Sequence, residues 1–169
     1  VRKGEVLGFA GLMGAGRTEV ARCVFGADPR STGTIQVHGR TVNVREASDA
    51  VRAGIGYLSE DRKQFGLLLE QDIKANTVMA AMRDFNIGGF ILDGKIRTVG
   101  QEYSQKLRVK TPNVHQLLGK LSGGNQQKVV ISKWLVRNCD VLIFDEPTRG
   151  IDVGAKEEIY DLIEQLSGQ

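Results

Sequence analysis

LSGGNQQK, residues Leu121–Lys128, is the stretch from which the fold can be inferred. A serine and two glycines stand directly before a segment with helical periodicity, so free backbone amides and a hydroxyl collect at the positive end of a helix dipole. Such an arrangement binds anions, and phosphate is the commonest of them in proteins. The stretch therefore predicts an anion site, which could hold phosphate or sulfate.

Two further motifs accompany this stretch. VLIFDEP, at Val141–Pro147, is a continuous apolar run typical of a strand buried in a parallel sheet, and it ends in two acids. GLMGAGRT, at Gly11–Thr18, lies between a predicted buried strand, Glu5–Ala10, and a predicted helix, Thr18–Phe25. Glycines in such a loop let backbone amides turn toward phosphates. The plainer alternative for the loop is a glycine-rich turn with an exposed arginine.

In this order, the three motifs resemble the Walker A, signature and Walker B elements of the ABC ATPases, over nearly the whole chain. The resemblance implies an α/β fold: a P-loop NTPase core with a mostly parallel sheet, a small β-hairpin and an inserted helical subdomain. We expect a single ABC ATPase domain over residues 1–169, with the core in 1–64 and 121–169 and the helical subdomain in about 65–120.

The resemblance assigns nucleotide binding to two sets of residues. The Walker A set is Gly11, Gly14, Ala15, Gly16, Arg17 and Thr18, and the signature set is Leu121, Ser122, Gly123, Gly124, Asn125 and Gln126. ATP and Mg²⁺ are the implied cofactors.

The resemblance assigns the chemical roles to acidic residues at and after the end of the predicted strand in VLIFDEP. Asp145, the Walker B acid, would hold Mg²⁺ together with Thr18, and Glu146 would polarise the attacking water as general base. An acidic strand end that caps the next helix is the alternative. Asp152, at the end of TRGID, resembles the family's D-loop residue, which crosses to a partner domain.

Two positions depart from the family pattern. Arg17 stands where Walker A has lysine, and a planar guanidinium does not simply replace a compact ammonium beneath the phosphates. Glu60, the Q-loop equivalent, stands after the predicted strand Ile55–Ser59 in place of glutamine and begins the run EDRK. A carboxylate there could ligate Mg²⁺ but would repel a γ-phosphate oxygen. A solvated charge run is the alternative.

The rest of the chain alternates between hairpin, strand and helix patterns. His38 is expected to face solvent or merely to pack rather than to act in catalysis, His115 is expected at the surface, and Trp134 is expected in the core. The predicted elements are a hairpin over Thr34–Val44, helices over Ala47–Ala53, Ile73–Phe85, Val99–Val109 and Gln126–Val136, a turn-rich Asn86–Gly94, and a closing helix with Ile159, Leu162, Ile163 and Leu166 on one face.

Composition narrows the class of protein. With 23 basic and 20 acidic residues the net charge is +3, too small an excess to argue for a nucleic-acid partner. The longest uncharged apolar stretch, Val6–Gly16, is shorter than the roughly 18 residues of a membrane helix, so we expect a soluble protein that is not secreted. Cys23 and Cys139 lack ligand spacing and are expected to be reduced thiols.

Arg17, the EDRK run at Glu60, the signature and the segment DEPTRGID together resemble the second, C-terminal ATP-binding domain of the tandem ATPases that power bacterial monosaccharide import, such as that of ribose, galactose, arabinose or xylose. The resemblance implies three partners: the first nucleotide-binding domain of the same polypeptide, transmembrane permease subunits and, indirectly, a periplasmic sugar-binding protein. It places the protein at the cytoplasmic face of the bacterial inner membrane. The signature would complete the first domain's ATP site, while this domain's own Walker A site would be degenerate.

The family's adenine-stacking aromatic residue and switch histidine have no counterpart in the chain. We therefore expect a fragment truncated at both ends, poorly active alone and with an unpaired sheet edge that favours self-association. Two alternatives stay open. One is a regulatory ATP-sensing module that does not hydrolyse ATP. The other is an ABC-type ATPase of DNA repair or chromosome organisation, which would normally carry long coiled coils, and no heptad pattern is present.

Overall fold

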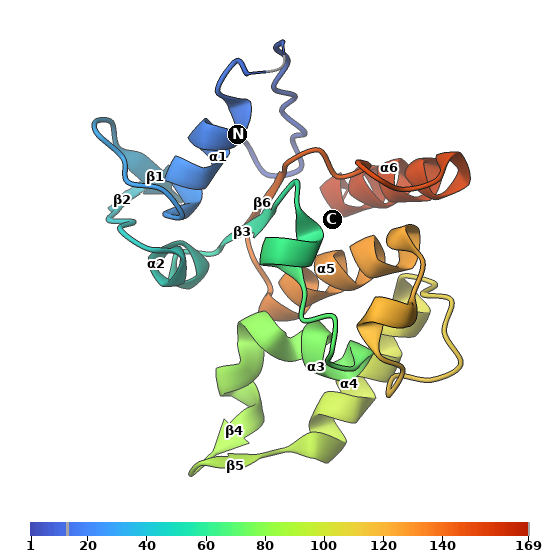
Figure 1. The fold of residues 1–169 in the computed structure, drawn as a ribbon. Coiled ribbons are helices and arrows are strands. Elements are labelled where there is room, and N and C mark those ends of the chain that lie inside the picture. Colours follow the sequence, from blue (N-terminus) through green and yellow to red (C-terminus); the bar gives the residue numbers. More distant parts are fainter. Residues whose placement is uncertain (13, 169) are drawn as a thin grey trace.

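The computed structural model describes residues 1–12 and 14–168. At its centre lie two parallel strands, β3 (Ile55–Leu58) and β6 (Val141–Phe144), and every residue of β3 is buried. Figure 1 shows two helices to the left of this pair, α1 (Arg17–Phe25) and α2 (Ala47–Arg52), and two to its right, α5 (Gly123–Arg137) and α6 (Val153–Ser167). The strands are thus enclosed by helices, as parallel strands generally are.

The predicted hairpin is present as β1 (Ile35–Val37) and β2 (Arg40–Val42), which pair antiparallel. Its two-residue turn consists of His38, with φ 51°, and Gly39, with φ 72°, the backbone of the turn type that suits hairpin twist. His38 is exposed, as predicted, and its Nε2 lies 3.3 Å from Asp140 Oδ2.

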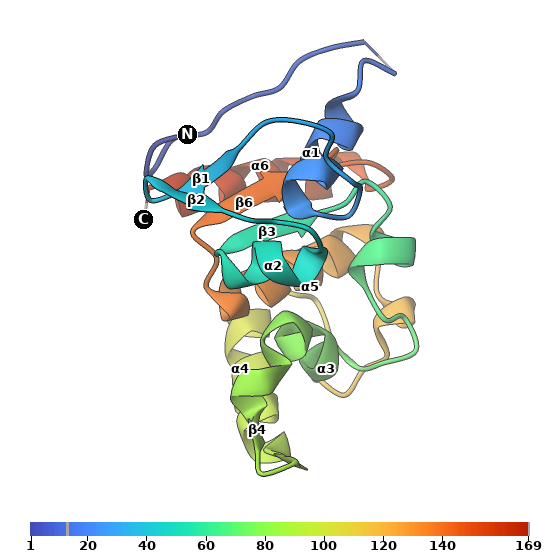
Figure 2. The ribbon, with the colours of Figure 1, turned by 90° about the vertical axis from the view of Figure 1, so that its left-hand side faces the viewer.

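The predicted strand Glu5–Ala10 is wrong. Residues 5–10 join none of the sheets in the described part of the chain, and the apolar side chains of this segment are exposed, Phe9 at 67%. An apolar run becomes a strand only where a neighbouring strand pairs with its amides and carbonyls. Figure 2 shows the segment running along the outside of the molecule, above β1 and α6.

Helix α1 lies where the sequence predicts a helix, and Gly26 ends it with φ 76°. Val20 is 52% exposed, and Phe25 is the buried residue of the helix. Helix α5 begins at Gly123 rather than at Gln126, so the signature glycines form its first turn.

Residues 62–120 hold most of the remaining elements. They are the π-helix η1 (Arg62–Gly66), α3 (Ile73–Val78), the 3₁₀-helix η2 (Met79–Phe85), the strands β4 (Asn86–Ile87) and β5 (Phe90–Ile91), α4 (Asp93–Lys106) and the 3₁₀-helix η3 (Leu118–Lys120).

Three predictions in this region need correction. The helix predicted over Ile73–Phe85 is divided into α3 and η2, with non-helical backbone at Ala81. The helix predicted over Val99–Val109 begins at Asp93 and ends at Lys106. It begins early because the strand β5 ends at Ile91, two residues before the helix starts. The stretch predicted as a turn contains that hairpin, β4 and β5, whose turn glycines have φ 59° and 90°.

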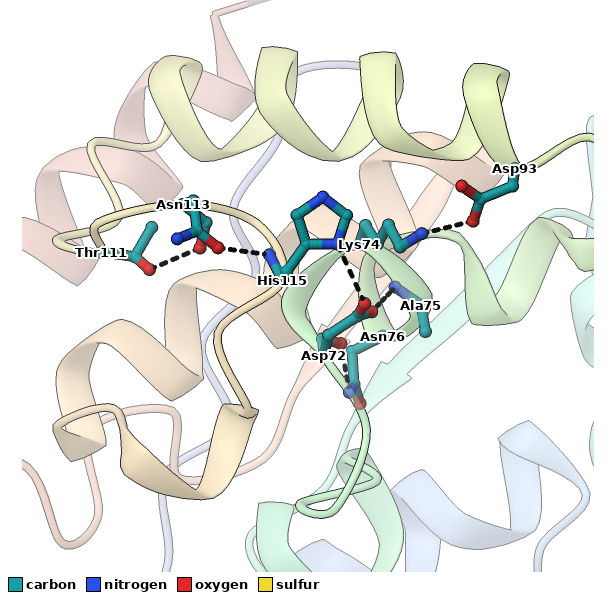
Figure 3. A network of polar contacts seen from close by, with 8 residues as sticks. All are labelled: Asp72, Lys74, Ala75, Asn76, Asp93, Thr111, Asn113 and His115. Carbon is teal, nitrogen blue, oxygen red and sulfur yellow. Dashed lines mark hydrogen bonds and ion pairs between the residues drawn. The ribbon is translucent and has the colours of Figure 1, made fainter.

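A polar network fastens α3 to its neighbours (Figure 3). Asp72 caps α3 by accepting a bond of 2.9 Å from the Ala75 amide, and its other carboxylate oxygen lies 3.8 Å from Nδ1 of the exposed His115. Lys74 forms an ion pair with Asp93 at the start of α4. Within residues 1–12 and 14–168, no helix has the length and apolar character required to cross a membrane.

Candidate functional site

The carboxyl ends of β3 and β6 bring two acidic segments to one edge of the strand pair. The parallel register pairs Leu58 with Phe144, and the Asp145 amide extends the ladder by donating to Leu58 O at 2.9 Å. Ser59 and Glu60 therefore emerge beside Asp145 and Glu146. This is the edge at which open parallel sheets bind their ligands.

Asp145 joins the glycine-rich loop to this edge. Its Oδ1 accepts a hydrogen bond of 3.2 Å from the Thr18 hydroxyl, at the start of α1. Its Oδ2 accepts a buried bond of 2.8 Å from the Tyr57 hydroxyl. Burial first, and then this bond, raise the pKa of Tyr57 well above its ordinary value, so the phenol stays a donor. Thr18 and Asp145, the two predicted Mg²⁺ ligands, are thus in contact.

The donor set suits Mg²⁺. A hydroxyl and a carboxylate are the hard oxygen ligands that Mg²⁺ prefers, and protein sites for this ion use one or two side chains beside waters and phosphates. No group of three or more His, Cys, Asp or Glu side chains is placed to hold a metal in the part of the chain that the structure describes. Thr18 and Asp145 could hold the ion together with a bound phosphate.

The glycine-rich loop ends at the uncapped beginning of α1. Gly16 is the N-cap residue, with φ 83°, and no side chain among the described residues caps the first amides of the helix. Gly14 has φ 79°, a backbone that L side chains rarely adopt. The amides of the first turn are therefore available to an anion. Met13 lies outside the described residues.

Arg17 and Glu146 form an ion pair across this edge. Arg17 Nη1 lies 3.3 Å from Glu146 Oε1, and the two side chains are about one third and one half exposed. Glu146 has φ 46°, which is uncommon for a residue other than glycine. The Walker A departure and the predicted general base are thus in contact with each other. Neither Asp145 nor Glu146 acts as the helix cap that the alternative required; Asp152 caps α6 instead.

The signature residues lie at the start of α5, which Figure 1 shows well apart from α1. Ser122 is the N-cap residue, and its Oγ accepts a bond of 2.8 Å from Asn125 Nδ2. Gln126 is buried and donates to the carbonyls of Leu118 and Leu121, so its contacts in this chain are structural. The half-buried Leu121 packs against the core.

Gly124 stands against α6, because a Cβ added there would lie 2.5 Å from the Cβ of Ala155. Asp152 Oδ1 accepts a bond of 2.9 Å from the Ala155 amide and thereby caps α6. A cavity of about 210 Å³ opens here, lined in part by Ser122, Asn125 and Asp152. The signature and the predicted D-loop therefore meet at one surface.

The Glu60 side chain forms an ion pair with Arg149, in the TRGID segment. The EDRK run is only partly solvated: Asp61 caps η1 by accepting from the amides of Lys63 and Gln64, and Arg62 is buried. The alternative of a solvated charge run is therefore wrong for Arg62.

Sequence reasoning did not identify Tyr57 or Arg62 as site residues. A signal for Tyr57 existed, since a tyrosine in a buried strand needs a partner for its hydroxyl and the nearest strand end carries two acids. Arg62 gave no such signal, because a charged residue in the run EDRK looks like any solvated residue.

Comparison with known proteins gives a consistent result. A family model described as ABC transporter matches residues 1–149. The chain is 60% identical over 168 residues to a Burkholderia lata protein named as a ribose/galactose/methyl galactoside import ATP-binding protein, covering 99% of this chain and 33% of the relative. It is 50% identical over 167 residues to a ribose import ATP-binding protein of Lactococcus lactis, covering 99% and 34%. The chain thus spans about one third of the length of these relatives.

Solved structures agree on the fold. A dimeric ATP-binding cassette in a post-hydrolysis state with ADP and phosphate superposes with a TM-score of 0.71 at 20% identity, covering 91% of this chain and 66% of the other. A nucleotide-free cassette from an ABC transporter gives 0.72 at 18% identity, covering 92% and 63%. These matches confirm the predicted α/β fold with a P-loop NTPase core.

Proposed function

This chain belongs to the ABC transporter family, and we propose that it is the second nucleotide-binding domain of a tandem ATPase that couples ATP hydrolysis to monosaccharide import. The relatives named for sugar import support this proposal, since they match 99% of the chain at 50–60% identity. Their greater length leaves room for a first domain on the same polypeptide. The observation that carries the ATP-binding part is the contact between Thr18 and Asp145, directly beneath a glycine-rich loop.

In the proposed Walker A site, the amides of the loop and of the first turn of α1 bind phosphates. Thr18 and Asp145 would hold Mg²⁺, which neutralises phosphate charge when bound. Glu146 is the proposed general base, which would accept a proton from the attacking water. Its ion pair with Arg17 supports the view that this site is degenerate, because Arg17 occupies the carboxylate of the proposed base.

The signature is proposed to serve the first domain's ATP site rather than this one. Ser122 and the amides of Gly123 and Gly124 begin α5, where the helix dipole favours a phosphate. The separation between this helix start and α1 fits a site shared by two domains. Asp152 would support the contact between domains indirectly, because its cap fixes the start of α6.

The permease is proposed to bind where the core meets the helical subdomain. A cavity of about 460 Å³ lies there, lined by residues from both regions, among them Ser59, Phe65, Met79 and Ala80. Ser59, which lines this cavity, directly precedes Glu60. A permease segment that docked here would therefore lie next to the carboxyl ends of β3 and β6, where the nucleotide is proposed to bind. The same proposal places the protein at the cytoplasmic face of the inner membrane. It also includes a periplasmic sugar-binding protein as an indirect partner.

The test is the ATPase rate of the complete protein assembled with its permease in lipid. We expect hydrolysis to rise severalfold when a sugar-loaded binding protein is added, and the isolated chain to turn over far below the roughly 10 per second typical of enzymes. ATP binding without stimulated hydrolysis would favour the ATP-sensing module. Stimulation by DNA instead of sugar would favour a repair or chromosome ATPase.

A further inference from the structure

Arg62 is a buried cation that no acidic side chain neutralises by a direct bond in the described ranges. Only 9% of the residue is exposed. Its Nη1 donates to Arg149 O at 2.9 Å and its Nη2 to Gly150 O at 3.3 Å, while its Nε is buried without an acceptor in the described part of the chain. Burial lowers the pKa of Arg62, which reflects the cost of removing its charge from water.

Such an arrangement is a poor source of stability. A buried charge that meets two neutral carbonyls and leaves one donor unpaired costs desolvation that an apolar side chain of similar size would avoid. The residue is therefore better explained by what it holds in place.

Arg62 connects its own segment with two segments that are distant in sequence. It begins η1, two residues after Glu60. Its guanidinium holds the carbonyls of Arg149 and Gly150, in the D-loop segment 148–152. A Cβ added to Gly123 would lie 2.8 Å from Arg62 Nη2 and 3.0 Å from Gly150 O. The signature, the D-loop segment and the segment after β3 therefore meet at this one side chain.

A second link runs in parallel. The Arg149 residue whose carbonyl accepts from Arg62 also forms an ion pair with Glu60 through its side chain. The D-loop segment is thus attached to the segment after β3 once through its backbone and once through a side chain. A displacement of residues 60–62 would therefore pull on the D-loop segment through these bonds, and it would change the contact of Arg62 with Gly123.

We propose that Arg62 is a positioning residue that transmits movement of the Glu60 segment to the D-loop and to the signature. The proposal rests on the proposed function, in which those two motifs face the first domain's ATP and the Glu60 segment adjoins the permease. Arg62 touches no substrate and acts through the backbone of residues 149 and 150. A guanidinium suits this task because its planar fork can bond two carbonyls at once, which an ammonium does with poorer geometry.

The test compares Arg62→Met and Arg62→Lys with the exposed-arginine control Arg40→Met in the complete protein, by amide hydrogen exchange and by ATPase rate. In Arg62→Met we expect exchange in residues 148–152 to accelerate at least tenfold while residues 128–135 of α5 are unchanged. Stimulated hydrolysis should fall at least tenfold, with the Kd for ATP within twofold of wild type. Arg62→Lys should fold, and its exchange in residues 148–152 and its ATPase rate should lie between those of wild type and Arg62→Met. Arg40→Met should match wild type in both measurements.

Equal acceleration in α5 and the D-loop, or a normal D-loop in Arg62→Met, would overturn the proposal. The proposal would also fail if Arg62→Lys behaved as wild type in both measurements, because charge alone would then suffice. Hydrogen exchange does not depend on transport. If the wild-type protein shows no sugar-stimulated hydrolysis, the proposed function fails, and the exchange result still decides the role of Arg62.

Discussion

The Arg17 guanidinium lies 3.3 Å from Glu146 Oε1, so the residue that replaces the Walker A lysine contacts the predicted general base. Both side chains are partly exposed, and ion pairs of this kind contribute only about 0–1 kcal/mol. A phosphate could therefore displace Glu146 from Arg17 at little cost. The pair is the physical reason for our proposal that this site is a weak catalyst that still binds nucleotide.

Ser122→Arg should abolish most sugar-stimulated hydrolysis in the complete protein, whereas Glu146→Gln should leave more than half of it. The first change removes a phosphate contact and blocks closure on the first domain's ATP, and loss of one such donor commonly costs about 100-fold or more in rate. The second affects only the site that we propose to be degenerate. Steady-state phosphate release of the two reconstituted variants makes the comparison, and the reverse order of effects would mean that the Arg17 site is the catalytic one.

Tyr57→Phe should destabilise the protein by about 1–3 kcal/mol, because Asp145 is buried and would lose its hydrogen bond from the phenol. The denaturant midpoint of the transition that includes β3 measures this. Tyr160→Phe is the matched control, since the Tyr160 hydroxyl lies 3.2 Å from Thr148 Oγ1 on an exposed surface, and it should change the midpoint little. Equal effects of the two changes would contradict the importance of the Asp145 contact.

Gly124→Ala should destabilise the contact between α5 and α6 by about 1–3 kcal/mol, because its new methyl group would lie 2.5 Å from the Cβ of Ala155. Adding Ala155→Gly should restore much of the loss, which a double-mutant cycle of unfolding free energies can measure. Gly154→Ala is the control, because a Cβ there meets only ordinary contacts. Failure of Ala155→Gly to rescue Gly124→Ala would show that the close approach is not the cause.

Between pH 8 and 10, Lys133 should make stability rise with pH. Burial lowers the pKa of Lys133 from 10.5 to about 8, so in this window the unfolded chain binds the proton that the folded chain has released. The free energy of unfolding then increases with pH, and the penalty is fully present below pH 8. The total effect is at most about 3.5 kcal/mol, since one pKa unit corresponds to ~1.4 kcal/mol.

Denaturant midpoints at several pH values check this contribution by comparing wild type with Lys133→Met. The variant should lack the rise between pH 8 and 10, although it also loses the bond from Lys133 Nζ to Gly66 O, 2.8 Å long. Lys106→Met, at the exposed end of α4, should keep the wild-type slope. An identical slope in Lys133→Met would show that the lysine stays charged in the folded protein.

The sequence by itself determined the elements whose signals are local. The hairpin of β1 and β2 follows from alternation around Gly39, although its turn consists of His38 and Gly39 rather than of Gly39 and Arg40. Strand β6 follows from an uninterrupted apolar run, and α5 from helical periodicity after two glycines. The second hairpin carried the same kind of signal in Gly88 and Gly89 and could have been predicted. Neighbouring residues encode these features, since turn chemistry and periodicity act over a few positions.

Only the tertiary structure decided which side chains meet at the site. Tyr57 reaches Asp145 across 88 positions of sequence, and Arg62 reaches Arg149 across 87. It also decided that residues 5–10 stay exposed, because an apolar run needs a paired neighbour to become a strand. Local patterns specify an element and its buried face, whereas the partners of a buried donor or acceptor depend on how the elements pack.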